Sequence, residues 1–325
     1  MTRFLLRRLG WLLLTVWAVA TLSFFLMRAV PGGPLSSERR LAPEVEANVA
    51  ARYHLDWPLW RQYLQYLGPL NLDERGLLGD GTRLLGGALT GDLGPSFRQR
   101  DYSVNEILAQ SLPISIELGV WALAWAVVIG LAAGILAGLY PHSRGDALLR
   151  GLATLGIALP NFVLASLLLL AFAIGLKVLP VAGWGTPRHL VLPALALGAP
   201  FAAYIARLAR TGLLEALAQD SIRTAVAYGL PPWRIVLERA LRPACLPVVS
   251  YLGPAAAGVL TGSLVIERIF AIPGAGSHFV GSALNRDYTL AMGVTLVYTV
   301  LVYVLNTLVD LLYPLLDPRI RLEES

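Results

Sequence analysis

Six long stretches of the chain contain no charged residue. They are residues 9–27, 118–143, 151–176, 190–206, 243–266 and 288–309. A helix needs about 20 mainly apolar residues to cross the ~30 Å hydrocarbon core of a bilayer. The pattern therefore predicts an all-α integral membrane protein with six transmembrane helices.

The composition excludes several other classes of protein. Hydrophobic residues make up 56% of the chain and charged residues only 14%, whereas a soluble domain carries roughly 25% charged residues. A soluble enzyme, a disordered chain and a fibrous repeat are therefore excluded. Cys245 is the single cysteine, so the chain has no intrachain disulfide or thiolate cluster, and no two of the 4 histidines have the i, i+4 spacing of a metal site.

The chain also lacks a nucleotide-binding loop. A P-loop requires a Gly-Lys pair followed by Ser or Thr, but the only lysine, Lys177, lies between Leu176 and Val178. We therefore expect no cofactor in this chain, and any energy for its work must come from another subunit or from a gradient.

Arginines in the short loops predict the orientation in the membrane. Cytoplasmic loops are enriched in arginine and lysine, and Arg3, Arg7 and Arg8 precede the first span. Six crossings then place the arginines of loops 144–150 and 207–242, and those of the tail, on the same side. We expect both termini to be cytoplasmic. Because the arginines border apolar runs and form no basic tract, we expect no nucleic acid partner.

The spans divide the chain into four parts. Residues 1–30 hold the cytoplasmic N-terminus and the first span, residues 31–110 form an external segment, residues 111–315 form a core of five transmembrane helices, and residues 316–325 form a cytoplasmic tail. In the external segment, residues 57–67 carry an amphipathic helical stripe, which we expect to pack on neighbouring helices or to lie at the interface.

Within the core, loop 207–242 contains a predicted short helix. Asp220 is the expected N-cap of a helix over residues 221–228, and Gly229 is expected to end it with a left-handed turn. Pro231 and Pro232 begin another helix that leads into the fifth span. Two interpretations of these residues remain open. The segment is either a helix on which a cytoplasmic partner exerts force, or a basic loop that fixes topology and contacts anionic lipid.

This loop resembles a known motif. Arg223-Thr224-Ala225, followed by Gly229 and by Ala240-Leu241, is similar to the Glu-Ala-Ala-x-x-x-Gly loop of binding-protein-dependent ABC importer permeases. Two departures from the general pattern, Arg223 in place of Glu and Arg242-Pro243 in place of Leu-Pro, match the peptide-importing branch of that family.

Further motifs resemble the B-type permease of oligopeptide and dipeptide ABC importers. In chain order they are Pro31-Gly32-Gly33-Pro34, Tyr53-His54-Leu55-Asp56, Gly91-Asp92-Leu93-Gly94-Pro95-Ser96-Phe97, Asp101-Tyr102-Ser103-Val104-Asn105, Leu179-Pro180-Val181-Ala182-Gly183-Trp184, Thr261-Gly262-Ser263-Leu264-Val265-Ile266-Glu267, Pro273-Gly274-Ala275-Gly276, Leu284-Asn285-Arg286-Asp287-Tyr288 and Leu316-Asp317-Pro318-Arg319-Ile320. They span nearly the whole chain. Residues 69–87 resemble an insertion relative to the family.

The resemblance implies the permease subunit of a type I ABC importer in a bacterial inner membrane, itself without catalytic residues. Its partners would be a second homologous permease, two ABC ATPases that bind ATP and Mg, and an external binding protein that delivers a peptide. The residues expected to couple to the ATPases are Asp220, Ser221, Arg223, Thr224, Ala225, Tyr228 and Gly229.

Polar residues in the spans are candidates for the translocation path, because such residues are costly in hydrocarbon. They are Glu117, Asn161, Glu267 and Asp310. We hypothesise that Glu117 and Glu267 flank the external mouth and meet a peptide amino terminus, although solvation or a salt bridge would also explain carboxylates near span ends. The ridge of Gly130, Gly134 and Gly138 predicts a close helix contact, either with another subunit or within the bundle.

Three other functions remain as alternatives. Permeases of nickel, glutathione and antimicrobial-peptide importers resemble the same type. A gradient-driven carrier would show mid-span ionisable residues or internal repeats, which this sequence lacks. An intramembrane hydrolase would need paired carboxylates or a Ser–His pair at depth, but the histidines fall in loops.

Overall fold

The computed structural model describes residues 2–29, 55–68, 87–99 and 102–316. Within these ranges the chain is helical, and only two isolated bridges, Gly87–Asp92 and Pro95–Ser103, pair extended backbone. The Pro31-Gly32-Gly33-Pro34 motif, the predicted insertion at 69–87 apart from Gly87, and the tail beyond Leu316 lie outside the described residues.

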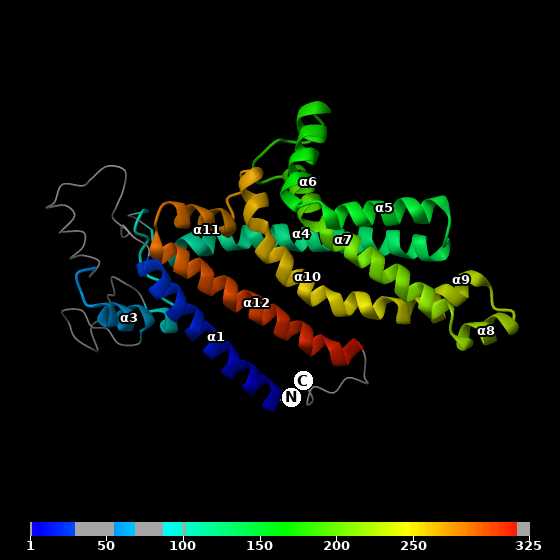
Figure 1. The fold of residues 1–325 in the computed structure, drawn as a ribbon, viewed down its shortest axis with the longest axis horizontal. Helices are drawn as coiled ribbons and strands as arrows, with labels where there is room; N and C mark the ends of the chain where they lie inside the picture. The colour runs from blue at the N-terminus through cyan, green and yellow to red at the C-terminus, as the bar shows by residue number, and fades with distance from the viewer. Residues whose placement is uncertain (1, 30–54, 69–86, 100–101, 317–325) are drawn as a thin grey trace. The chain divides into compact units, whose positions relative to one another are not determined.

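The chain divides into two compact units, and Figure 1 labels most of the helices that they contain. Unit 1 comprises Met1–Ile114 and Gly274–Tyr303, and unit 2 comprises Ser115–Pro273 and Val304–Ser325. The helices of unit 1 are α1 (Thr2–Ala29), α3 (Leu59–Leu67), the short η1 (Ala88–Thr90), α11 (Ala275–Leu284) and the first parts of α4 (Val104–Leu139) and α12 (Tyr288–Leu316). Unit 2 holds the rest of α4 and α12 with α5 (Arg144–Ala158), α6 (Asn161–Leu168), η2 (Leu169–Gly175), α7 (Pro187–Leu217), α8 (Asp220–Ala227), α9 (Pro232–Ile235), η3 (Val236–Ala240) and α10 (Leu241–Ile269).

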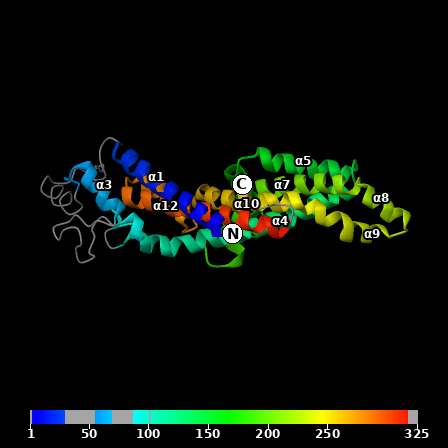
Figure 2. The same cartoon turned by 90° about the horizontal axis from the view of Figure 1, so that it is seen from below.

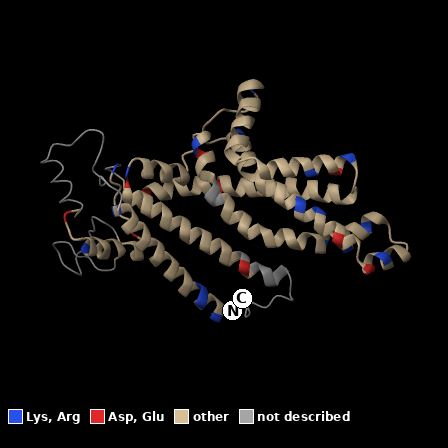
Figure 3. Ribbon diagram, viewed as in Figure 1, with Lys and Arg blue, Asp and Glu red and all other residues tan. Residues whose placement is uncertain are grey.

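Four described helices are long and apolar enough to cross a membrane, and two bent pairs raise the number to 6 if each is one span. The four are Arg3–Ala29, Val104–Leu139, Pro187–Leu217 and Tyr288–Leu308. Figure 3 shows that the long helices carry almost no charged residue along their middle. These helices correspond to the first, second, fourth and sixth predicted spans.

The third predicted span, residues 151–176, is not one helix. The chain turns by 112° between Arg144–Ala158 and Asn161–Gly175. The residue before a proline is pushed out of the helical region, and Leu159, which precedes Pro160, is extended with φ −79° and ψ 126°. The third predicted span is therefore a bent pair of helices, which still counts as one of six spans if the pair crosses the membrane once, and Asn161 begins α6 instead of lying within a continuous helix. The fifth predicted span also bends, by 51° between Pro232–Val259 and Ser263–Ile269.

In unit 1, the predicted amphipathic stripe forms α3 and packs on α1. Phe24 is fully buried, and its ring lies 5.4 Å from that of Tyr63 and 5.6 Å from that of Tyr66. Arg28 covers Phe24 at 4.3 Å and donates its Nε to Gln62 Oε1 at 2.7 Å. Tyr63 of the stripe therefore packs on α1 as expected, whereas Trp60 of the stripe is 63% exposed.

Also in unit 1, two of the motifs quoted above meet at Asp287. Its buried carboxylate accepts hydrogen bonds from Ser96 Oγ, from the backbone N–H of Phe97 at 3.1 Å and from that of Leu290 at 3.3 Å. A buried carboxylate is tolerated only when it is well paired. Asp287 thus ties the external segment to the start of α12.

In unit 2, the glycine ridge of α4 packs against α7. A Cβ on Gly130 would lie 2.8 Å from Ile205 Cβ, and a Cβ on Gly134 would lie 2.7 Å from Ala209 Cβ. From the other side, a Cβ on Gly198 of α7 would lie 2.5 Å from the carbonyl oxygen of Ala122. Small residues let helix backbones approach closely in a membrane. Of the two interpretations of the ridge, the contact within the chain is the one observed.

We predict that Gly134→Ala destabilises the protein. The added methyl group would overlap Ala206 and Ala209, and overpacking of this kind costs about 1–3 kcal/mol. Thermal unfolding in detergent should show a lower Tm. Gly151 is a matched control because it also lies inside a helix, but a Cβ there meets nothing within 4 Å. Gly151→Ala should leave the Tm unchanged or raise it, and equal losses in the two variants would contradict the prediction.

Candidate functional site

The predicted coupling segment is α8, which lies beyond the ends of α7 and α10 in both views (Figure 1, Figure 2). α8 begins at Asp220, and the extended residue before it, Gln219, occupies the N-cap position with φ −69° and ψ 149°. The prediction of Asp220 as N-cap is therefore wrong, because its own backbone is already helical. Its carboxylate instead lies in the first turn, where it complements the helix dipole, 3.3 Å from Arg223 Nη1.

The end of α8 is a complete Schellman motif. The backbone N–H of Leu230 donates to the carbonyl of Ala225 at 3.2 Å, and that of Gly229 donates to Val226 at 2.9 Å. Both bonds require a left-handed residue after the helix, and Gly229 has φ +74°. The predicted left-handed end at Gly229 is confirmed. It stops α8 sharply and directs the chain into α9.

One face of α8 is anchored to the helices on either side of it. Ile222 and Ala225 are each 7% exposed. They belong to a buried cluster with Leu213 and Ala216 of α7, Ile235 of α9, Ala240 of η3 and Ala244 of α10. Helix α8 therefore rests on the ends of two long helices and is not an isolated loop.

The other side of this region is exposed and partly apolar. Asp220, Ser221, Arg223 and Thr224 are exposed, and Tyr228 and Trp233 are 83% and 64% exposed. We call these six residues together with Val226 and Leu237, also exposed, the docking surface. Tyr228 and Val226 lie between the candidate spans, whereas Trp233 and Leu237 belong to the segment Pro232–Val259 of the bent fifth span.

Sequence reasoning found only part of this surface. Asp220, Ser221, Arg223, Thr224 and Tyr228 were predicted, whereas Val226, Trp233 and Leu237 were not. A tryptophan directly after two prolines gives no periodic signal of burial or exposure. Ala225 was predicted as a coupling residue, and the structure places its side chain in the anchoring cluster.

A buried ion pair ties α7 to α5 close to this region. Asp146 is 1% exposed and accepts from Arg210 Nε at 2.7 Å and Arg210 Nη2 at 3.0 Å. Ser143 caps α5 by accepting from the backbone N–H of Asp146 at 3.1 Å, and Asp146 in turn accepts from the N–H of His142 at 3.0 Å. A bidentate Arg–carboxylate pair is geometrically specific. Because α7 leads directly to α8, this pair joins the coupling segment to the turn between α4 and α5.

The path candidates do not form one group. Glu267 is fully buried and accepts a hydrogen bond from Ser115 Oγ at 2.7 Å. Glu117 lies two residues beyond Ser115 on α4 with its side chain exposed, whereas Asn161 at the start of α6 and Asp310 on α12 are partly buried. Ser115 was missed from the sequence, since a serine in an apolar span gives no sign of a partner 152 residues away.

Comparison with known proteins places the chain in a family. A sequence model described as "Binding-protein-dependent transport system inner membrane component" matches residues 130–322, and its N-terminal counterpart matches residues 1–119. The oligopeptide transport system permease protein OppB of Haemophilus influenzae is 46% identical over 99% of this chain and 100% of its own length. OppB of Escherichia coli is 44% identical with the same coverage. The dipeptide transport system permease protein DppB of Bacillus subtilis is 44% identical over 100% of both chains.

Solved structures show the same fold at lower sequence identity. A chain of the inward-facing MetNI methionine ABC transporter matches with a TM-score of 0.55 and 18% identity, covering 65% of this chain and 96% of that one. A chain of an amino acid ABC transporter matches with a TM-score of 0.53 and 16% identity, covering 64% of this chain and 94% of that one. The chain, a multi-pass membrane protein with the fold of an ABC importer permease, thus belongs to the family of binding-protein-dependent transport system inner membrane components.

Proposed function

We propose that this chain is a permease subunit of an ATP-driven peptide importer. The observation that carries the proposal is the similarity to oligopeptide and dipeptide permeases, which extends over their full length at 44% to 46% identity. The direct test is uptake of a labelled peptide by vesicles that contain the chain with its partners. Nickel and glutathione serve as competing cargoes, because related permeases carry them.

The chain works with partner subunits in this proposal. A second homologous permease completes the path, and an external binding protein delivers the peptide. Two ABC ATPases bind ATP and Mg, since this sequence contains no Gly-Lys-Ser or Gly-Lys-Thr. The permease itself carries no catalytic residue. Both termini and α8 face the cytoplasm, in keeping with the arginine distribution.

Coupling operates through α8. The docking surface contacts the ATPases, and their closure on ATP displaces α8. Because Ile222 and Ala225 are buried with residues of α7 and α10, the displacement moves the ends of both helices together. The Asp146–Arg210 pair extends this movement to α5. ATP can shift the equilibrium between the inward-facing and outward-facing states of the permease only to the extent that the ATPase contacts stabilise one state more than the other.

We predict that Gly229→Pro uncouples ATP turnover from peptide uptake. Proline fixes φ near −65° and has no N–H, so it removes the bond to Val226 and cannot adopt φ +74°. The cost is about 3 kcal/mol or more at the end of α8. The six spans are unaffected, and the protein should still insert. ATPase activity of the reconstituted complex should no longer respond to the peptide-loaded binding protein.

A substitution at the same position provides the control. Asparagine keeps the N–H and enters the left-handed region more readily than most residues, so Gly229→Asn should retain most of the stimulation. Normal coupling in Gly229→Pro would count against the role of α8.

We also predict that the charge of the exposed Glu117 favours peptides with a free amino terminus, whereas Glu267 is fully buried against Ser115. Glutamine at position 117 keeps the shape and removes the charge, and a hydrogen bond to a charged group contributes about 1.5–3 kcal/mol. Uptake of unmodified peptides should fall roughly tenfold, while uptake of N-acetylated peptides should not change. Glu215→Gln, which alters an exposed carboxylate on α7, is the matched control. An unchanged preference for unmodified peptides in Glu117→Gln would disprove the role of this carboxylate.

A further inference from the structure

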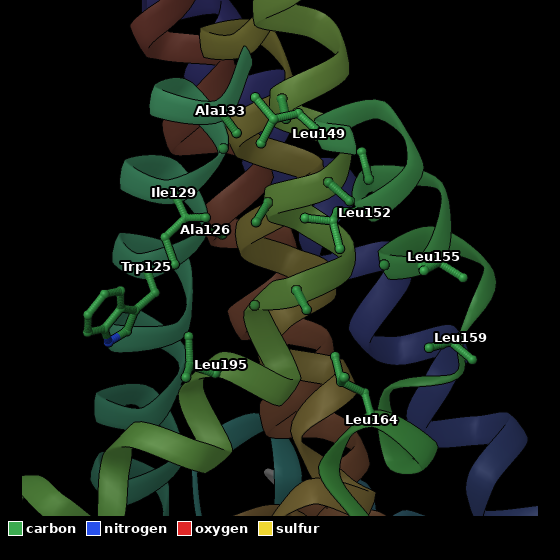
Figure 4. A pocket seen from close by; sticks show the side chains of 18 of the residues that line it. Trp125, Ala126, Ile129, Ala133, Leu149, Leu152, Leu155, Leu159, Leu164 and Leu195 are labelled. Carbon is green, nitrogen blue, oxygen red and sulfur yellow. The ribbon is translucent and has the colours of Figure 1, made fainter. Parts of the chain in front are cut away.

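An apolar groove lies between α4, α5, α6 and α7 in unit 2. Its volume is about 410 Å³. Trp125 and Ile129 of α4, Leu152 and Leu155 of α5, and several alanines of α7 line it. Figure 4 shows these side chains along the groove, with Leu159 and Leu164 together at one end. α4 and α7 are candidate membrane spans, and α5 and α6 form a bent pair that is either a broken span or a re-entrant loop.

A second, polar cavity of about 200 Å³ continues from the groove. The two cavities share Ala133, Leu149, Ala153 and Ala206. The second cavity adds the three cations Arg150, Arg207 and Arg210 and the hydroxyls of Thr154 and Thr211. One continuous depression is therefore apolar along most of its length and cationic at one end.

The cationic end carries net positive charge. Asp146 pairs with Arg210 at 2.7 Å and lies 3.3 Å from Arg150, so a single carboxylate is shared between two guanidinium groups. Arg150 is 55% exposed at its side chain. Arg207 is exposed and forms no ion pair with a carboxylate among the described residues. The arginine distribution predicts that this end faces the cytoplasmic leaflet.

We propose that the joined cavities bind an anionic phospholipid, with its phosphate between Arg150 and Arg207 and one acyl chain in the groove. Basic pockets between transmembrane helices on the cytoplasmic side are suited to anionic headgroups. The hydroxyl of Thr211 supplies a donor for a remaining phosphate or glycerol oxygen, whereas the hydroxyl of Thr154 donates to the carbonyl of Arg150 at 2.9 Å. The groove continues directly from this point, so that one molecule occupies both cavities.

The length of the groove and its cationic end favour an acyl chain. The lining residues of α7 run from Ala194 to Ala206, which is about 18 Å at 1.5 Å per residue and somewhat more than half of a ~30 Å hydrocarbon core. An unbranched chain reaching from the headgroup toward the middle of the bilayer fits it. The proposal does not depend on the nature of the transported cargo.

The test is lipid retention by the assembled, purified transporter, measured by native mass spectrometry. Phosphatidylglycerol and phosphatidylcholine with identical acyl chains are offered together. We expect preferential retention of phosphatidylglycerol, and in Arg150→Gln/Arg207→Gln we expect that preference to fall by about tenfold to thirtyfold, since each arginine near an anionic lipid contributes about 1 kcal/mol. Arg144→Gln/Arg268→Gln removes the same charge from exposed positions outside both cavities and should retain the preference.

Two further arms test the groove itself. Ala153→Leu narrows the junction of the cavities and should lower retention with all arginines present. A photoactivatable residue at position 152, in the groove, should form an adduct with the mass of a phospholipid in the assembled complex. Unchanged retention in Arg150→Gln/Arg207→Gln, equal loss in the Arg144→Gln/Arg268→Gln control, unchanged retention in Ala153→Leu, or cross-linking of position 152 to a second permease in place of lipid would overturn the proposal.

Discussion

Backbone hydrogen bonding in hydrocarbon is the constraint on which the rest of this structure depends. Each N–H and C=O in the bilayer core must be satisfied within the protein, so the spanning segments must be helices. The hydrophobic effect provides little attraction between such helices, and close packing of small residues takes its place. The contacts of Gly130 and Gly134 with α7, and of Gly212 with Ala244 of α10, make α4, α7 and α10 a closely packed set. These closely packed helices support α8.

In unit 2, polar contacts supplement the packing of small residues and join particular pairs of helices. Asp146–Arg210 joins α5 to α7, and Ser115–Glu267 joins α4 to α10. Truncating one member of such a pair would leave a buried polar group without a partner, which costs more than the pair itself contributes. These contacts therefore fix which helices move together. The apolar cluster around Ile222 connects α8 to the ends of α7 and α10, and in the proposed coupling it would carry a displacement of α8 to both.

Much of this architecture could be predicted from the sequence, because the signals are local. Uncharged length identified the spans, and Gly229, two residues before Pro231-Pro232, identified the end of α8. The errors arose where the outcome depends on backbone conformation or on distant partners. A proline inside an apolar run is compatible with a kink or a complete break, and Pro160 produces a break of 112°. The sequence does not show whether Gln219 or Asp220 is the first residue with helical backbone angles. In the structure it is Asp220. The partner of Glu267 and the exposure of Trp233 depend on tertiary contacts.

The bend at Pro160 also places α6 beside the groove. Leu159 and Leu164 line the groove with residues of α4, α5 and α7 (Figure 4), and Arg150 lines the polar cavity that adjoins it. A depression that is apolar along most of its length and cationic at one end favours a ligand with one charged end and one apolar tail. The proline that bends the third predicted span thus contributes to the shape on which lipid binding would depend.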